Sequence, residues 1–353
     1  MKFILAIDSF KGCLTSMEAE NVVAESFGKR EIETLCLPMS DGGEGMLDAF
    51  TSALGGTLEP VYIHNHMMRR VDAQYGITAD GTAIIEVAQA CGLTLVKEDE
   101  RNPMRSTTYG VGELLSRAVK RGCRKFIIGL GGTGTSDAGI GMIRALVDIF
   151  ARGKNFDEAM KTELGECRFT LASDVCNPLY GENGAAHVFA PQKGATPEMV
   201  EMLDRRAKLF ADKSALHFGF DKSSEPGAGA AGGLGYAFMQ YLGAEVKSGA
   251  DLLLDIIGFN DKIKDADMVI TGEGRADRQT LMGKLPYKIL QRGKESGIPV
   301  GLVAGRIAEK EKLLSAGFAF ADSITPSEMP QEEAIKKETA LSNLQRWAAS
   351  LSL

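Results

Sequence analysis

Short apolar runs along the chain end abruptly in small or acidic residues, and segments with helical spacing lie between them. The runs at 2–7, 33–39, 125–130, 267–271 and 300–305 predict buried strands. The intervening segments at 16–30, 44–56, 112–122 and 284–297 place apolar positions three or four residues apart, which predicts amphipathic helices. Alternation of buried strands with amphipathic helices is the pattern of a parallel α/β sheet.

Two regions depart from this alternation. Residues 57–95 contain short alternating segments with a turn signal at 79–82, which predicts antiparallel strands. Residues 167–259 combine short segments, one helix over 197–216 and a glycine-rich stretch. We therefore predict an α/β fold of two domains. A discontinuous Rossmann-like, doubly wound parallel-sheet domain covers 1–57, 96–166 and 260–353, and an inserted mixed α/β domain covers 58–95 and 167–259. We expect the active site in the cleft between them.

Composition narrows the class of protein. The 353 residues are 44% hydrophobic and carry a net charge of −7, which argues against a general nucleic-acid binder because that role needs a basic face. The N-terminal stretch meets Asp8 too early for a signal peptide, and we expect neither a membrane span nor a membrane partner, so the predicted location is cytoplasmic. The six cysteines show no C-x-x-C spacing and are expected to be reduced.

Four of the predicted strands end in loops that are rich in glycine and acidic residues. These loops cover 7–12, 39–45, 129–137 and 270–277. In an open parallel sheet, ligands bind beyond the carboxyl ends of the strands. Glycine lets backbone N–H groups approach a phosphate closely, and a following helix N-terminus adds partial positive charge. Together the four loops favour a site for a phosphorylated ligand.

The glycine spacing at Gly129, Gly131 and Gly134 fits the dinucleotide pattern G-x-G-x-x-G, but its context does not. A dehydrogenase needs an acid at the end of the next strand, about 20 residues on, to bind a ribose. Here the next strand ends at Asp174, which lies 40 residues after Gly134. The nucleotide-binding pattern G-x-x-x-x-G-K-[ST] is also missing, because Gly283-Lys284 is followed by leucine. Neither a dehydrogenase nor a P-loop enzyme is favoured.

The remaining chemistry is phosphoryl transfer. It needs carboxylates that hold Mg²⁺ or accept a proton, together with cations and N–H groups that neutralise phosphates. The loops supply both kinds of group. They are Asp8, Lys11, Asp41, Glu44, Asp137, Asp174, Glu273, Arg275, Asp277 and Lys284.

Read together, these loops resemble the type-1 glycerate kinases, which transfer phosphate from ATP to glycerate. The resemblance covers nearly the whole chain. Its most distinctive stretches are IDSFKGCLTS, LPMSDGGEGMLDA, IIGLGGTGTSDAGIGM, SDVCNPLYGENGAAHVFAPQKGATPEMV and VITGEGRADRQTLMGKLP. It implies a two-domain fold with a Rossmann-like domain, ATP and Mg²⁺ as cofactors, and 2-phosphoglycerate as the product. Bacterial members of the family commonly act in glyoxylate, glycolate or sugar-acid breakdown.

The chain departs from the family pattern at three places. Gly134 and its neighbours stand where the family usually has G-G-S-A-T-x-D-G-G, and Cys176 replaces the acidic residue of D-V-D-N-P. After Phe150 the chain is about 25 residues shorter than is usual in the family, a kind of deletion that loops tolerate. These changes concern the edge of the nucleotide site more than the class of reaction.

These observations define a set of candidate site residues. Asp8 and Asp174 are the leading candidates for Mg²⁺ ligand and general base, in either order, because each ends a strand; Lys11 and Arg275 are placed to meet a phosphate or the substrate carboxylate. The phosphate- and nucleotide-binding candidates are Gly131, Gly132, Thr133, Gly134, Thr135, Asp137, Gly272, Glu273 and Gly274. The substrate-binding candidates are Ser9, Asp41, Gly42, Gly43, Glu44, Asp277, Gln279 and Lys284.

The predicted function is ATP-dependent phosphorylation of D-glycerate to phosphoglycerate, with the small molecule as the partner and a homodimer left open. Three alternatives stay open at this point. They are a kinase of another small hydroxy acid, a degenerate relative that binds a nucleotide or metabolite, and a nicotinamide-dependent oxidoreductase supported by the glycine spacing alone.

Overall fold

The computed structural model describes residues 1–10, 12–40, 42–43 and 45–351. The chain divides into two compact units, and each is described by itself. The first unit consists of residues 1–41 and 250–353, and the second of residues 42–249. The candidate residues Lys11, Asp41 and Glu44 lie outside the described residues.

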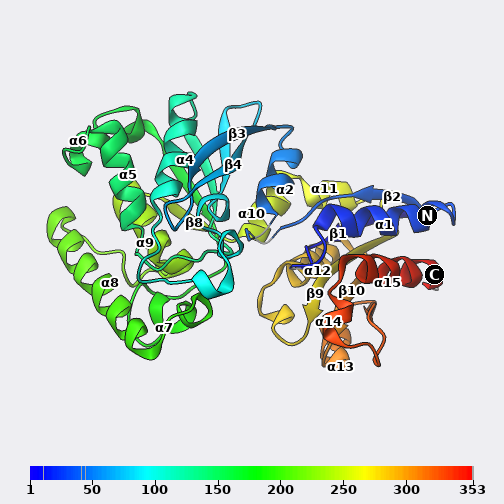
Figure 1. Cartoon of the computed structure of the whole chain (residues 1–353). Coiled ribbons are helices and arrows are strands. Elements are labelled where there is room, and N and C mark those ends of the chain that lie inside the picture. Colours follow the sequence, from blue (N-terminus) through cyan, green and yellow to red (C-terminus); the bar gives the residue numbers. More distant parts are fainter. Residues whose placement is uncertain (11, 41, 44, 352–353) are drawn as a thin grey trace. The chain divides into compact units, whose positions relative to one another are not determined.

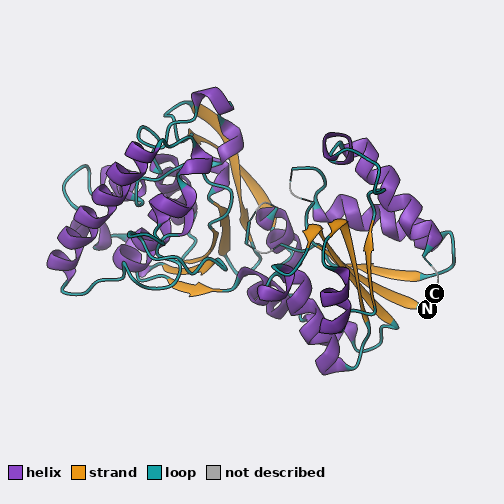
Figure 2. Cartoon of the chain, turned by 90° about the horizontal axis from the view of Figure 1, so that it is seen from below, coloured by secondary structure: helices purple, strands orange, loops and turns teal. Residues whose placement is uncertain are grey.

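The first unit is built on a parallel five-stranded sheet in the order β11-β10-β9-β1-β2. Helices cover both faces of this sheet (Figure 1, Figure 2). Its strands are β1 (Lys2–Ile7), β2 (Glu33–Cys36), β9 (Met268–Ala276), β10 (Val300–Ile307) and β11 (Phe320–Ser323), and its helices are α1 (Ser16–Gly28), α10 (Gly249–Ile256), α11 (Phe259–Ile263), α12 (Leu285–Ser296), α13 (Lys310–Ala316), α14 (Gln331–Ala334) and α15 (Lys337–Ser350).

Alternation along β1 explains how the sheet is covered on both faces. Phe3, Leu5 and Ile7 share one core cluster with residues of α1 and α15, and the ring of Phe3 packs edge-on against Phe27 at 5.5 Å. Ile4, on the opposite face of the strand, is buried as well. Burial on both faces is why this strand appears in the sequence as a continuous apolar run.

A buried carboxyl group, Glu20 of α1, supports the end of β1. One of its oxygens accepts a hydrogen bond from the N–H of Ile7 at 3.0 Å, and its side chain is fully buried. The hydroxyl of Ser16, at the start of the same helix, donates to the carbonyl of Ile7 and accepts from the N–H of Met39 at 2.8 Å. Two side chains of α1 thus fix the chain where β1 ends, directly before Asp8.

Burial raises the pKa of Glu20 well above its ordinary value of 4.5, although backbone hydrogen bonds offset part of that rise. Above pH 4.5 the folded protein therefore retains a proton that the unfolded chain has released, so the free energy of unfolding falls as pH rises. We expect Glu20→Gln to reduce the loss of stability between pH 5 and pH 8 by about 1 kcal/mol or more.

Urea unfolding of both proteins at the two pH values measures this difference. Glu25→Gln, at an exposed position of the same helix, is the matched control and should keep the wild-type pH dependence. An unchanged pH dependence in Glu20→Gln would show that the pKa of Glu20 is not raised in the folded protein.

The second unit is built on a mixed six-stranded sheet in the order β3-β4-β5-β6-β7-β8. The pairs β3–β4 and β4–β5 are antiparallel, and the remaining pairs are parallel. Its strands are β3 (Thr57–His64), β4 (Arg70–Ile77), β5 (Thr82–Glu86), β6 (Lys125–Gly129), β7 (Arg168–Ala172) and β8 (Glu245–Lys247), and its helices are α2 (Met46–Ala53), α3 (Ala88–Cys91), α4 (Tyr109–Lys120), α5 (Ile140–Phe150), α6 (Phe156–Met160), α7 (Ala185–Phe189), α8 (Pro197–Phe218) and α9 (Ala230–Leu242).

The predicted fold class is confirmed, since the chain is an α/β protein with one parallel and one mixed sheet. The predicted division of the chain differs from the structure at 42–57 and 96–166, which lie in the second unit, and at 250–259, which lies in the first. The reason is strand pairing: β6 lies between β5 and β7, so the apolar run that begins at Lys125 joins the mixed sheet and not the sheet of β1. Periodicity identifies a buried strand but does not show which sheet it joins.

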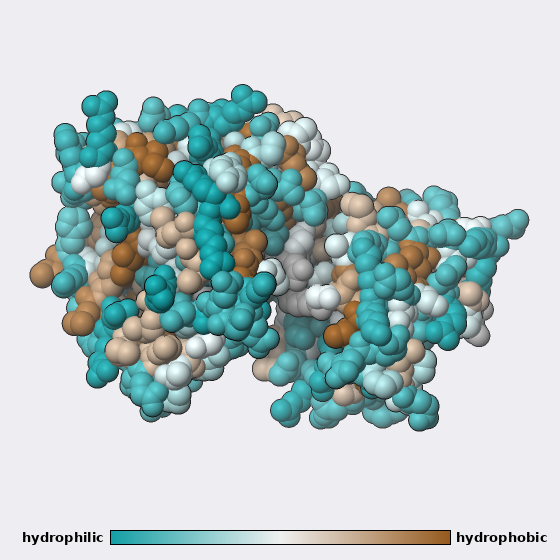
Figure 3. Space-filling view, in the orientation of Figure 1, coloured by the Kyte–Doolittle hydropathy of each residue, from teal (hydrophilic) through white to brown (hydrophobic). Residues whose placement is uncertain are grey.

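None of the helices in the described ranges is both long enough and apolar enough to cross a membrane. Hydrophilic residues cover most of the face shown in Figure 3. The six cysteines are free thiols, as their spacing predicted.

Candidate functional site

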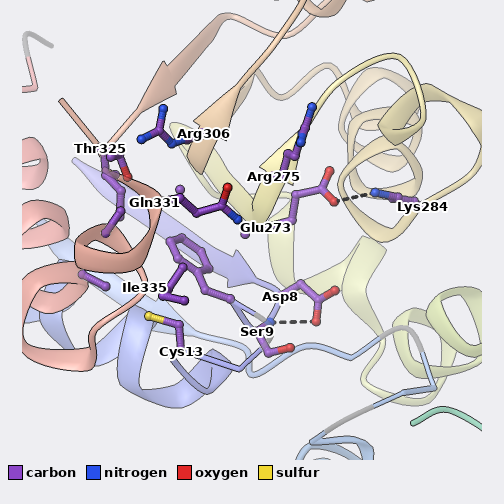
Figure 4. A pocket seen from close by; sticks show the side chains of 16 residues that line it. Asp8, Ser9, Cys13, Glu273, Arg275, Lys284, Arg306, Thr325, Gln331 and Ile335 are labelled. Carbon is purple, nitrogen blue, oxygen red and sulfur yellow. Dashed lines mark hydrogen bonds and ion pairs between the residues drawn. The ribbon is translucent and has the colours of Figure 1, made fainter. Parts of the chain in front are cut away.

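The carboxyl ends of β1 and β9 meet at the point where the strand order of the first unit reverses. From β1 the chain proceeds outward to β2, and from β9 it proceeds in the opposite direction to β10 and β11. Open α/β sheets bind ligands at such switch points. A cavity of about 340 Å³ lies here, and its polar lining includes Asp8, Ser9, Glu273, Arg275 and Lys284 (Figure 4).

Asp8 and Ser9 follow β1 directly and are both buried. The backbone N–H of Asp8 donates to the carbonyl of Gly272 at 3.0 Å, which continues the pairing of β1 with β9 by one residue. The N–H of Ser9 donates to Oδ1 of Asp8 at 2.7 Å. Within the described part of the chain, the Ser9 hydroxyl has no hydrogen-bond partner, so it can serve a ligand.

Glu273 holds a lysine at the edge of the same cavity. Its two oxygens accept hydrogen bonds from the Thr280 hydroxyl at 2.6 Å and from Nζ of Lys284 at 3.1 Å. Glu273 is buried, whereas the Lys284 side chain is partly exposed. The arrangement fixes one positive charge directly before the first turn of α12.

Arg275 and Asp277 continue this edge after Glu273. The Arg275 side chain is largely exposed, and its Nε lies 3.6 Å from Oδ2 of Asp277. Oδ1 of Asp277 accepts the N–H of Gln279 at 2.8 Å, so this carboxylate shapes the turn before α12. Arg275 is therefore an exposed cation at the rim, and Asp277 acts first on the local backbone.

Residues 272–274 were predicted to be a phosphate-binding loop, and the structure corrects this. They lie inside β9, where Gly272 pairs with Ile7 of β1 and with Val303 of β10. A Cβ at Gly272 would stand 2.4 Å from the Val303 carbonyl oxygen, so this glycine permits close strand packing. The glycine signal here reflects the sheet and not an open loop.

In the second unit, glycines bring the segment at 42–43 against the ends of β6 and β7. A Cβ at Gly42, whose φ is +91°, would stand 2.6 Å from the carbonyl oxygen of Ala172. A Cβ at Gly131 would stand 2.5 Å from the Cα of Gly43. Two of the loops that the sequence singled out are therefore neighbours in space, and only glycine allows the contact.

The loop after β6 is held largely by its own unit. The N–H of Gly134 donates to the carbonyl of Cys91 at 2.7 Å, so it is not available to a phosphate. Asp137 accepts four hydrogen bonds through its carboxylate. The donors are the N–H and hydroxyl of Thr108 at 2.8 and 3.0 Å, the N–H of Gly141 at 3.0 Å and the N–H of Gly139 at 3.1 Å. Asp137 thus joins the starts of α4 and α5, and its geometry is that of a structural carboxylate.

We expect Asp137→Asn to lower the free energy of unfolding by about 2–3 kcal/mol, because an amide group would face N–H donors that now meet a carboxylate. Urea unfolding measures the change. Asp148→Asn, at a more exposed position of α5, is the matched control and should stay within about 0.5 kcal/mol of the wild type. If the Asp137→Asn protein instead kept wild-type stability and lost activity, Asp137 would be a ligand-binding residue.

Asp174 is exposed and follows β7 in the second unit. Asp8 lies in the first unit, so the two leading acidic candidates come from different units. Cys176, which stands where the family pattern has an acid, is exposed as well, and its Sγ lies 3.8 Å from the Asp174 carbonyl oxygen.

Sequence reasoning missed Lys193, which contacts the loop after β6. Its Nζ donates to the carbonyl of Thr135 at 2.6 Å and to the hydroxyl of Thr133 at 3.3 Å, and its side chain is buried. Burial lowers the pKa of Lys193 to about 8. His66 is also buried close by, with its pKa lowered to about 4 by burial and by the charges of Lys193 and Arg101. No spacing in the sequence marks Lys193.

The described residues do not contain a cluster of three or more His, Cys, Asp or Glu side chains that could bind a metal ion by themselves. His64 is paired with Glu113 at 3.0 Å, and β3 ends at His64, so His66 lies beyond the strand.

Comparison with known proteins gives the chain a family. Residues 3–352 match the family model described as "Glycerate kinase family". The chain is 37% identical to a glycerate kinase of Bacillus subtilis (strain 168), an alignment that covers 100% of this chain and 97% of that protein. It is also 37% identical to a glycerate 2-kinase of Escherichia coli (strain K12), over 88% of this chain and 86% of that protein.

A solved structure gives the same result. A crystal structure from Salmonella typhimurium LT2, described as that of a proposed glycerate kinase 2, superposes with a TM-score of 0.81 at 34% identity. The match covers 99% of this chain and 96% of that one. Agreement in both sequence and fold along almost the full length removes the oxidoreductase alternative. The chain belongs to the glycerate kinase family and is a phosphotransferase.

Proposed function

We propose that this glycerate kinase transfers the γ-phosphoryl group of ATP to a hydroxyl of D-glycerate, with Mg²⁺, and releases 2-phosphoglycerate. The observation that carries the proposal is the polar half of the cavity at the ends of β1 and β9. There the buried Asp8 carboxylate, a Ser9 hydroxyl without a partner among the described residues, and a lysine held by Glu273 line one cavity. Phosphoryl transfer needs this combination of groups.

Four side chains at this cavity, Asp8, Glu273, Arg275 and Lys284, have a proposed part in the reaction. Asp8 accepts the proton of the attacking glycerate hydroxyl as its oxygen bonds to the γ-phosphorus, and ADP leaves with the electrons of the broken P–O bond. Lys284 neutralises charge on the phosphates, and Glu273 keeps its ammonium group in place. Arg275 is exposed, and we propose that its guanidinium group leaves Asp277 to bind a phosphate or the substrate carboxylate with two parallel hydrogen bonds.

The residues of the cavity fit a magnesium ion that arrives with the nucleotide. Mg²⁺ usually binds through one or two carboxylates together with substrate phosphates, so it does not need a complete protein cage. Asp8 lines the cavity directly beyond the end of β1, and it would contact the ion if Asp174 instead accepts the proton. The ion would reduce the negative charge on the phosphates. Asp174 stays the second candidate for an acidic role.

In the second unit, we propose that the backbone of residues 131–133 and 135 supports the phosphates and that Lys193 holds this segment in shape. The contacts of Lys193 with Thr133 and Thr135 support this role. Apart from Lys284, the substrate-binding candidates named from the sequence keep that proposed role. We also propose a cytoplasmic location and a function in glyoxylate or sugar-acid breakdown.

The test is ADP release from ATP and Mg²⁺ with D-glycerate, L-glycerate, glycolate and lactate as acceptors. We expect turnover with D-glycerate to exceed turnover with the others. Turnover with another hydroxy acid and none with either glycerate would contradict the proposed substrate, whereas ADP release without an acceptor would show hydrolysis only.

A further inference from the structure

The cavity of the first unit has a second half that the transfer of a phosphoryl group does not use. Its lining is apolar and consists of Phe10, Cys13, Ile324, Ala334, Ile335 and Ala340. These residues come from the segment between β1 and α1 and from the part of the chain that follows β11 and continues into α15. Figure 4 shows Ile335 and Cys13 at the end of the cavity away from Lys284.

Glycerate does not explain an apolar surface of this kind. Each of its three carbons carries oxygen, so a wall of aliphatic and aromatic side chains offers it no matching contact. A nucleobase does match, because its flat faces are apolar while its edge forms hydrogen bonds. Thr325 and Gln331 line the same end and provide hydroxyl and amide groups for that edge.

The size and position of the cavity also favour a nucleotide as its ligand. Its volume of about 340 Å³ is at the lower end of the range for small-molecule pockets, which suits a nucleoside with its phosphates extending outward. The phosphates of a nucleoside bound there would extend toward the polar half, where the buried Ser9 hydroxyl has no partner among the described residues. A nucleotide thus satisfies both halves at once.

We propose that the apolar half of this cavity binds the nucleoside of ATP, with the triphosphate directed toward Ser9 and Lys284. The inference rests on the proposed function, and it assigns the base to the first unit. The glycine loop after β6, which first suggested nucleotide binding in the sequence, then has no part in recognising the base.

Substitution at the cavity wall tests the assignment. Ala334→Phe places a ring in the apolar half, and we expect the KM for ATP to rise roughly tenfold or more while the KM for glycerate changes less than about twofold. Inhibition by inorganic tripolyphosphate, which lacks a nucleoside, should be unchanged. Glu332→Phe, an exposed position of the same short helix that does not line the cavity, is the matched control and should keep the wild-type KM for ATP.

Cysteine labelling of the wild-type protein is an independent test that does not depend on the folding of the Ala334→Phe variant. Cys13 lines the cavity and is partly exposed, so alkylation followed by mass spectrometry can measure its reactivity. We expect ADP to protect Cys13, whereas tripolyphosphate and glycerate should not. Cys167, a partly exposed thiol in the second unit, is the reference within the same sample.

The outcomes separate this inference from the proposed function. Unchanged labelling of Cys13 under saturating ADP, or an unchanged KM for ATP in a folded Ala334→Phe protein, would overturn the nucleoside site while glycerate kinase activity stands. Protection of Cys13 by ADP in a protein that does not phosphorylate glycerate would support the nucleoside site and contradict the proposed substrate.

Discussion

Asp8→Asn is expected to lower kcat for glycerate phosphorylation by about 10²- to 10⁴-fold, the range for loss of a positioned proton acceptor. Asparagine keeps the shape of the side chain and can still accept the hydrogen bond from the N–H of Ser9. It cannot take a proton from the attacking hydroxyl, and it is a much weaker ligand for Mg²⁺. The affinity for ADP measured without Mg²⁺ should remain within about threefold, because the base and sugar contacts are unaffected.

Asp267→Asn is the matched control. Asp267 precedes β9 at the opposite edge of the same sheet, where its carboxylate accepts the N–H of Lys2. Its substitution should leave kcat unchanged. If Asp8→Asn retained a kcat close to that of the wild type, Asp8 would be neither the proton acceptor nor the metal ligand, and Asp174 would become the first residue to test.

Lys193→Met is expected to lower kcat/KM by about 10²-fold, since a misplacement of about 1 Å in a catalytic site has an effect of that size. Lys193 binds the Thr135 carbonyl and the Thr133 hydroxyl, so its loss frees the loop after β6. Methionine preserves the length and apolar stem of the side chain. Lys161→Met, at an exposed surface pair with Glu158, is the control and should not change kcat/KM.

The pH dependence separates this positioning role from simple packing. Because the pKa of Lys193 is lowered to about 8, the side chain is charged below pH 8 and neutral above it. Wild-type kcat/KM should therefore fall as pH rises from 7 to 9, and the fall should be absent in Lys193→Met. An equal fall in both proteins would show that the charge of Lys193 does not contribute.

The elements were predictable from the sequence because apolar periodicity records burial directly. The run at the N-terminus gave β1, and the turn signal at 79–82 correctly marked the antiparallel pair β4–β5. The sheet to which each strand belongs was not predictable from periodicity. The run from Lys125 joined the mixed sheet, because pairing with β5 and β7 depends on contacts far apart in the chain.

The candidate site was predictable in part, for a related reason. Asp8 follows β1, Glu273 lies in the carboxyl-terminal half of β9 and Lys284 directly precedes α12, and the geometry of parallel sheets gathers such positions at one edge. Glycine was the less reliable indicator of a phosphate-binding loop. Gly272 permits close strand packing, and the N–H of Gly134 donates a hydrogen bond to the carbonyl of Cys91. Lys193 could not be found in this way, since its role arises from a tertiary contact with residues about 60 positions away.

The most direct test of the proposed reaction is NMR of the product formed by the protein from ATP, Mg²⁺ and D-glycerate. We expect ³¹P coupling to the proton on C2 of glycerate, which identifies 2-phosphoglycerate, together with one ADP for each phosphoglycerate. Coupling to the C3 protons would contradict the predicted position of phosphorylation, and unchanged glycerate with intact ATP would contradict glycerate as the substrate.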